Sequence, residues 1–233
     1  MTINIPEFEH SPYSLIVIAS VLTGFAAAVL LMRKFKVSKQ TILYTSLLTL
    51  ICTLVISLMS SLELTENGLE LGFSGLGAVV GLALGILVSG LIFKDKPEYV
   101  LASFAAAAPL MYGLSKTGCL LAGCCHGKPY SGPFAIVNHG YHAGSFFPAQ
   151  LVDMAVFIIL HIIALILVIK MENKLKAVYI LIAIALPVRF ATEYLRYTNT
   201  GILDKGQIKV LVAGAISIGI VVLWKKLLKV NNR

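Results

Sequence analysis

The amino-acid sequence predicts an all-α, polytopic membrane protein that forms a single domain over residues 1–233. Hydrophobic residues make up 58% of the chain and charged residues only 13%, whereas a soluble domain is about half apolar and about one quarter charged. Seven apolar stretches are each long enough for a helix to cross a hydrocarbon core of about 30 Å. They cover residues 13–32, 42–62, 74–93, 99–121, 148–169, 177–195 and 207–224.

The first three stretches differ in the residues that precede or interrupt them. No Lys or Arg lies in the first ten residues, so we expect the first stretch to be an anchor and not a cleaved signal peptide. The second contains Cys52, which we interpret as a small packing residue. The third carries Gly77, Gly81 and Gly85, and glycines four residues apart let a neighbouring helix approach closely.

Two prolines and one histidine lie in the interior of the other four stretches. Pro109 in the fourth and Pro187 in the sixth are expected to bend their helices. His161 lies in the middle of the fifth stretch, where we expect a hydrogen-bonded core residue. The seventh leads into a basic tail that ends at Arg233.

The basic residues define an expected orientation in the membrane. If the stretches alternate across the bilayer, thirteen Lys and Arg residues fall on the side of the C-terminus and six on the other side. The positive-inside rule then places the N-terminus outside and the C-terminus inside, and we expect a multi-pass membrane protein. Because the basic residues sort by loop, the net charge of +8 does not indicate a nucleic-acid partner.

Three charged residues near the end of the sixth stretch are the strongest functional signal. Arg189, Glu193 and Arg196 are spaced i, i+4 and i+7, so one face of a helix would carry all three. Charge inside a membrane is costly and is kept mainly where it pairs, meets water or holds a ligand. The alternative interpretation is a structural salt-bridge ladder.

Helix rise places polar residues of four different stretches near the outer surface. At 1.5 Å per residue, Lys116 and Arg196 rise to similar heights from the inner face. Gln150 and Asp153 lie within about two turns of the outer surface, and Ser74 begins the third stretch. These side chains are therefore expected to meet in the outer leaflet.

Residues 118–129 combine glycines with reactive side chains. The glycines are Gly118, Gly123 and Gly127, and the reactive residues are Cys119, Cys124, Cys125 and His126. The chain stays glycine-rich up to Phe147 and includes His139 and His142. Irregular backbone at membrane depth must pack in protein or line a wet cavity. We therefore expect a small outer cap or re-entrant segment at about 122–147.

Several motifs together resemble the prolipoprotein diacylglyceryl transferase family. Residues 115–129 are similar to its signature Gly-Arg-x-Gly-Asn-Phe-x-Asn-Gly-Glu-x-x-Gly-x-Pro, with Gly118, Gly123, Gly127 and Pro129 in register. The other similar segments are 72–75, 147–153, 189–196 and 206–207, which includes Gln207. The order and spacing of these segments agree with the family pattern over nearly the whole chain.

Six departures from the family pattern remove residues that are candidates for catalysis or lipid binding in that family. Lys116 replaces the signature arginine, Cys119 and Ala122 replace its asparagines, and Cys124 replaces its glutamate. Phe147 and Ser74 stand where the family has histidines. The chain is thus expected to be a divergent member, and another acceptor or another chemistry is an alternative.

The resemblance implies transfer of a diacylglyceryl group from phosphatidylglycerol to a cysteine thiol of a lipoprotein precursor at the outer face. Arg189 and Arg196 would hold the phosphate, because arginine binds two oxygens and stays charged, and Glu193 would orient them. His126, His142 or Asp153 would act as the base. The residues expected to contact substrate are Lys116, Gly118, Cys119, Gly123, Cys124, Gly127, Gln150, Ser74 and Gln207.

Two other classes of function compete with this interpretation. The cysteines, with His126, His139 and His142, would suit a redox or metal-binding membrane protein. Their spacing lacks a pair of Cys-x2-Cys knuckles, so we predict neither a metal nor a cofactor. A lipid or anion transporter would need a polar path to the inner face, and the inner halves of the stretches offer few polar groups.

Overall fold

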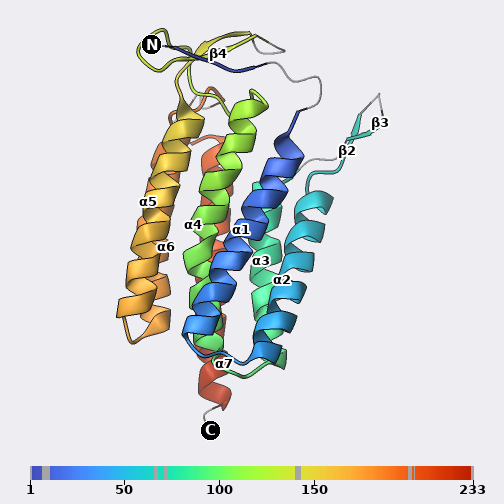
Figure 1. Ribbon diagram of the computed structural model, residues 1–233, viewed down its shortest axis with the longest axis vertical. Helices are drawn as coiled ribbons and strands as arrows, with labels where there is room; N and C mark the ends of the chain where they lie inside the picture. The colour runs from blue at the N-terminus through green and yellow to red at the C-terminus, as the bar shows by residue number, and fades with distance from the viewer. Residues whose placement is uncertain are drawn as a thin grey trace.

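Each helix of the structure, a computed structural model, begins where polar or turn-forming residues give way to an apolar run (Figure 1). The described residues are 2–6, 11–65, 68–70, 73–139, 143–198, 201 and 203–231, with no side-chain description for 63–65, 68–70 and 227–231. The helices in these ranges are α1 Tyr13–Lys34, α2 Lys39–Met59, α3 Gly75–Ile92, α4 Pro97–Leu121, α5 Ala149–Lys170, α6 Lys174–Glu193 and α7 Lys205–Asn231. The predicted helical class is confirmed.

Side-chain caps fix the starts of three helices. Ser38 accepts a hydrogen bond from the Thr41 amide at the start of α2, and Asn173 accepts one from the Lys176 amide at the start of α6. Ser74 caps α3 in the same way. A cap of this kind satisfies an amide that has no partner inside the helix.

Six helices of the described chain are long and apolar enough to cross a membrane: α1, α2, α3, α5, α6 and residues Lys205–Lys226 of α7. The fourth predicted stretch, 99–121, corresponds to α4, which is not one of these six. Instead, α4 packs against α1, α5 and α6, and twelve of its residues are buried. Its sequence includes Pro109, Gly113 and Lys116, which lower its hydropathy. The bundle is therefore arranged around the least apolar of its predicted spans.

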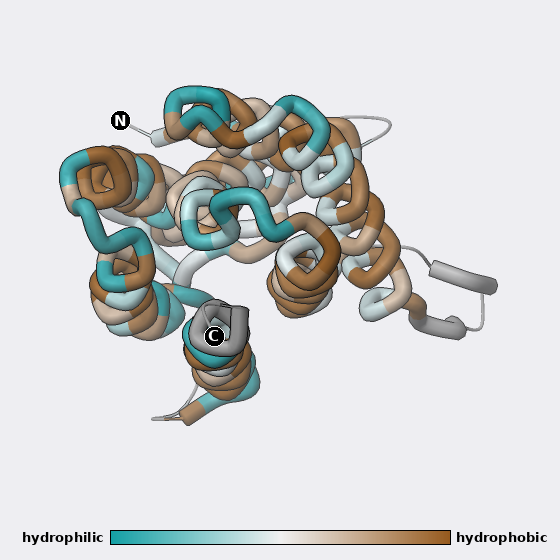
Figure 2. Tube along the Cα trace, turned by 90° about the horizontal axis from the view of Figure 1, so that it is seen from below, coloured by the Kyte–Doolittle hydropathy of each residue, from teal (hydrophilic) through white to brown (hydrophobic). Residues whose placement is uncertain are grey.

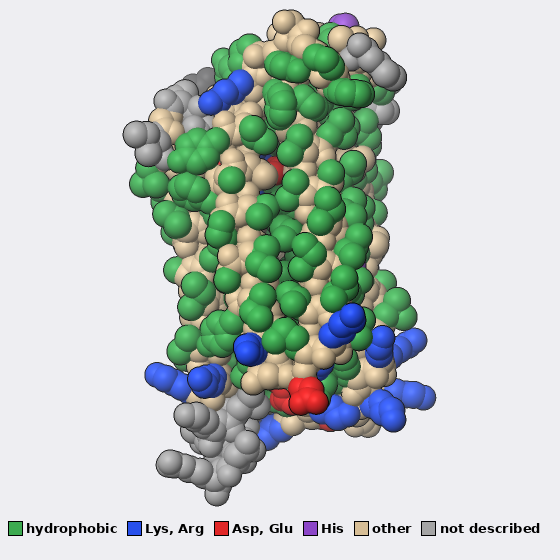
Figure 3. Space-filling model, turned by 90° about the vertical axis from the view of Figure 1, so that its left-hand side faces the viewer, with side chains coloured by type: hydrophobic (Ala, Val, Ile, Leu, Met, Phe, Trp, Pro, Cys, Tyr) green, Lys and Arg blue, Asp and Glu red, His purple; other side chains and the backbone are tan. Residues whose placement is uncertain are grey.

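The two ends of the bundle differ in charge. The α1–α2, α3–α4 and α5–α6 connections lie at the end that holds the C-terminus, and the N-terminus lies at the opposite end (Figure 1). Basic side chains gather at the first end, below a wide hydrophobic face (Figure 3). A view from this end shows hydrophilic connections and hydrophobic helix surfaces (Figure 2). The polar and apolar zones match those of a membrane-spanning bundle.

Short strands lie at the end opposite the C-terminus. β1 (Ile3–Asn4) pairs in parallel with β4 (Ile136–Asn138), and β4 pairs antiparallel with β5 (Gly144–Phe146). β2 (Glu63–Thr65) and β3 (Gly68–Glu70) form a separate antiparallel hairpin. The three-stranded sheet thus ties the N-terminal residues to the segment between α4 and α5.

The predicted close helix approach at the glycines of α3 is confirmed. A Cβ atom at Gly85 would lie 2.5 Å from Thr49 Cα, and one at Gly77 would lie 2.7 Å from the Ile56 carbonyl oxygen. Both neighbours are backbone atoms of α2. Only glycine therefore lets α2 and α3 approach to this distance.

Replacing the central glycine of this contact should destabilise the protein. A Cβ at Gly81 would lie 2.7 Å from Thr53 Cα, so Gly81→Ala must separate α2 from α3. We expect a loss of about 1–3 kcal/mol, measured as a lower Tm in detergent. Gly219→Ala in α7 is the control, because nothing lies within 4 Å of the added carbon. A Gly81→Ala protein as stable as the wild type would contradict this packing.

Candidate functional site

Five charged side chains from three helices and one loop meet near the end of the bundle opposite the C-terminus. Lys116 comes from α4, Asp153 from α5, Arg189 and Glu193 from α6, and Arg196 from the residues after α6. We call these five residues the charged cluster. Their side chains expose between 2% and 18% of their surface, and Arg189 is the most exposed. Acidic atoms are visible through an opening in the hydrophobic face (Figure 3).

The two carboxylates each contact two cations of the charged cluster. Asp153 Oδ2 lies 2.9 Å from Arg196 and 3.9 Å from Lys116 Nζ. Glu193 Oε2 lies 3.3 Å from Arg196 Nε and forms an ion pair with Arg189. Three cations and two anions leave one positive charge uncompensated within the cluster. A buried excess charge of this kind favours a monovalent anion as a ligand.

Tyr112 joins the charged cluster, and the sequence analysis did not select it. Its hydroxyl lies 3.1 Å from Arg196 and 3.4 Å from Asp153 Oδ2. Its ring faces Lys116 Nζ at 4.4 Å and the Arg189 guanidinium at 5.3 Å, both within the range of cation–π attraction. Tyr112 lies one turn before Lys116 on α4, and this i, i+4 spacing is the signal that would have identified it.

The environment of Arg196 keeps its guanidinium charged. Burial lowers the pKa of Arg196, but the Tyr112 hydroxyl and the neighbouring acidic groups outweigh burial and raise the pKa above its ordinary value. Arg196 Nε faces Glu193 Oε2 in the ion pair at 3.3 Å. The residue therefore offers a permanent charge inside the protein.

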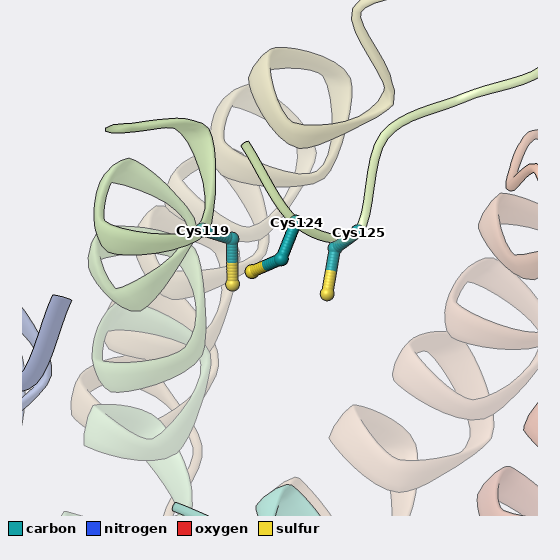
Figure 4. Close-up of side chains that lie close together, drawn as sticks. All are labelled: Cys119, Cys124 and Cys125. Carbon is teal, nitrogen blue, oxygen red and sulfur yellow. The ribbon is translucent and has the colours of Figure 1, made fainter. Parts of the chain in front are cut away.

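Three free thiols lie close together at the end of α4. Cys119 belongs to the last turn of this helix, and Cys124 and Cys125 follow in the loop. Their three Sγ atoms all lie within 4.8 Å of one another. Figure 4 shows the three sulfur atoms converging on one small region. We call these residues the thiol cluster; such a group of sulfur ligands is able to hold a soft metal ion.

The loop conformation brings the thiols together. Gly123 and Cys125 both have left-handed backbones, with φ angles of 68° and 56°, and Gln150 Nε2 donates a hydrogen bond of 2.8 Å to the Cys124 carbonyl. Hydrogen bonds with Cys119 and Cys124 lower the pKa of Cys125. The same interactions raise the pKa of Cys124. The three thiols thus interact through their hydrogen bonds and form one connected group.

The remaining signature glycines permit close backbone contacts. A Cβ at Gly127 would lie 2.5 Å from the Phe147 carbonyl oxygen, and the Gly127 amide donates to that oxygen. Gly118 faces Tyr13 of α1, where a Cβ would lie at 3.3 Å. The amides of Lys128 and Tyr197 bond to the carbonyls of Leu195 and His126. Backbone hydrogen bonds therefore hold the segment 126–128, which belongs to the family signature, beside the residues around Arg196.

Two other candidate residues, His126 and Gln207, belong to neither the charged cluster nor the thiol cluster. His126 packs between the rings of Phe146 and Tyr197 and lines a cavity of about 320 Å³. Gln207 is fully buried and accepts a hydrogen bond from the Asp204 amide at the start of α7. A methyl group at Gly206 would overlap the Glu193 carboxylate, so the start of α7 lies against the charged cluster.

Three further expectations concern residues away from the clusters. Ser74 caps α3 and accepts a hydrogen bond from Ser57 through its carbonyl, so the structure assigns it a local role. His161 forms the expected core hydrogen bond, with the Ala106 carbonyl. His139 is exposed and is not part of the thiol cluster, while His142 lies outside the described residues.

The fold and the two clusters define a multi-pass membrane protein with a buried, cation-rich site near one end of its helical bundle. The model of the prolipoprotein diacylglyceryl transferase family matches residues 1–225. The chain belongs to this family of transferases, which confirms the resemblance drawn from its motifs. No curated protein matches the chain at a significant level.

Removing the carboxylate of Asp153 should destabilise the bundle. Asp153→Asn leaves Arg196 and Lys116 buried without their shared anion, and breaking a buried ion pair costs about 3–5 kcal/mol. The expected result is a lower Tm in detergent. Glu172→Gln removes the same charge at an exposed site between α5 and α6 and should stay within about 0.5 kcal/mol of the wild type. Equal melting of the two variants would show that the pair contributes nothing.

Proposed function

We propose that this protein transfers a diacylglyceryl group from phosphatidylglycerol to the thiol of a cysteine in a lipoprotein precursor. Membership of the transferase family supports this reaction class. The carrying observation is the charged cluster, in which three cations and two anions lie close together inside an apolar bundle. Its excess charge matches the single negative charge of a phosphodiester.

The arginines of the cluster suit a phosphate in both geometry and charge. Arg189 and Arg196 carry planar groups of N–H donors that match two phosphate oxygens. Glu193 contacts both side chains and would hold them in position. Donors arranged before the reaction stabilise the charge that develops on the departing phosphate. Lys116 would supply the third cation, in place of the arginine of the family signature.

The proposed reaction displaces a phosphate ester at a carbon atom. The acceptor thiol loses its proton, its sulfur bonds to the terminal glycerol carbon of the diacylglyceryl group, and the carbon–oxygen bond to phosphate breaks. Glycerol phosphate leaves with both electrons of that bond. Asp153 lies within the cluster, and its Oδ1 has no hydrogen-bond partner in the described part of the chain. We propose Asp153 as the base, with His126 and His142 as the alternatives.

The proposed orientation places the charged cluster in the outer half of the membrane. In this arrangement α4 crosses the bilayer together with the six apolar helices, as a seventh span within a single domain. The N-terminus and the segment at 122–147 face outward, and the basic end faces inward. The site would then meet lipid precursors on the outer face of a bacterial cytoplasmic membrane.

A direct assay tests this function. Detergent-purified protein is incubated with phosphatidylglycerol and a peptide that carries a lipobox cysteine, and the peptide mass is measured. The expected product gains one diacylglyceryl unit. Replacing the peptide cysteine by serine should abolish the gain. A peptide that stays unmodified with intact, folded protein would refute the proposed acceptor.

Removing Arg189 should abolish turnover without unfolding the protein. Arg189→Ala deletes the most exposed cation of the cluster, and losing a donor to a developing anion lowers kcat by about 10²–10³-fold. Lys176→Ala is the matched control, because it removes an exposed cation at the other end of α6. Unchanged activity in Arg189→Ala, with normal insertion and melting, would exclude this residue from phosphate binding.

A further inference from the structure

We propose that Cys119, Cys124 and Cys125 form a three-thiolate site for one soft metal ion, Zn²⁺ or Cu⁺. The first support is geometric, because the three Sγ atoms already lie within 4.8 Å of one another. Sulfur–metal bonds of about 2.3 Å place the sulfur atoms of one coordination shell roughly 4 Å apart. Contraction by less than about 1 Å would therefore complete the shell.

The local backbone is organised around the sulfur atoms. Cys125 adopts a left-handed conformation that a residue with a side chain rarely takes. Gly123 also has a positive φ angle, and Gln150 anchors the Cys124 carbonyl. Cysteines that serve only as small packing residues need no such arrangement. Cys52, which lies inside α2 away from the other thiols, shows that simpler role.

The electrostatic surroundings also suit a metal bound by thiolates. Three thiolates around Zn²⁺ carry a net charge of −1, and around Cu⁺ a net charge of −2. Lys116 and Arg196 both interact electrostatically with Cys125. Two nearby cations would stabilise either complex. No other group of three metal-ligating side chains occurs within the described ranges, so the ligand set is purely sulfur.

The number of ligands distinguishes the two metals. Soft thiolate ligands select Cu⁺ and Zn²⁺ over harder cations. Cu⁺ is satisfied by three sulfur atoms, whereas Zn²⁺ with three protein ligands keeps a fourth position for water or another ligand. The site proposed here is tested separately from the phospholipid reaction, since it is measured by metal binding and not by turnover.

Metal titration of the purified full-length protein tests the proposal. Reduced protein in detergent is stripped with a chelator and titrated anaerobically with Zn²⁺, with Cu⁺, or with Co²⁺ as a spectroscopic probe of the zinc site. We expect one metal ion per chain and a sulfur-to-cobalt charge-transfer band. Tighter binding in the Zn²⁺ or the Cu⁺ titration identifies the preferred ion.

Single cysteine replacements separate this site from general metal binding. Cys125→Ser and Cys124→Ser should each weaken binding by more than about 100-fold, because loss of a ligand exceeds the 10–100-fold effect of losing a supporting group. Cys52→Ser is the matched control and should bind like the wild type. Melting curves show which variants remain folded. Two variants are used so that the test can still be made if one of them does not fold.

Two results would overturn the proposal. One is equal metal affinity in the wild type and in a folded Cys125→Ser or Cys124→Ser variant. The other is a disulfide that consumes two of the three thiols in protein isolated without added oxidant, as shown by thiol counting before and after reduction. Neither result changes what the transfer assay measures. The metal site can therefore be refuted without refuting the proposed function, and the reverse also holds.

Discussion

The ion pair between Arg196 and Asp153 joins the parts of the chain from which the site is built. Asp153 projects from the start of α5, and Arg196 follows the end of α6, so the pair brings these two helix ends together. The segment similar to the family signature then bonds to the backbone beside Arg196, because the Lys128 amide donates to the Leu195 carbonyl and the Tyr197 amide donates to the His126 carbonyl. A buried ion pair is stable only when both partners stay in place, so the charged cluster holds this end of the bundle in one arrangement.

Three of the replacements that separate this chain from the family signature lie close together in the structure. Cys119 and Cys124 stand where the signature has an asparagine and a glutamate, and they lie together in the thiol cluster. Lys116 replaces the signature arginine and interacts electrostatically with Cys125. Two neighbouring positions of the signature thus carry sulfur in place of oxygen and nitrogen groups, beside a cation that is kept as lysine.

Much of the fold and part of the site followed from simple regularities of the sequence. Apolar stretches of membrane length predicted the helices, and the spacing of Arg189, Glu193 and Arg196 predicted one charged group. Helix rise placed Asp153 and Lys116 at the correct height to join it. Tyr112 was missed because its signal in the sequence is the i, i+4 spacing to Lys116, which any residue at that position of the helix would share. The cysteines were recognised as candidate redox or metal ligands, but their convergence was not predicted, because it depends on left-handed turns that spacing rules do not describe.

The graded exposure of the charged cluster sets the order in which an approaching molecule meets its side chains. Arg189 exposes 18% of its side chain, Arg196 11% and Lys116 7%. An amphiphile that diffuses in the plane of the bilayer would reach Arg189 before the deeper cations. Its acyl chains need not leave the hydrocarbon region, because the outer surfaces of the helices are apolar. Sideways access of this kind would admit lipids while excluding water-soluble phosphates that share the same head group.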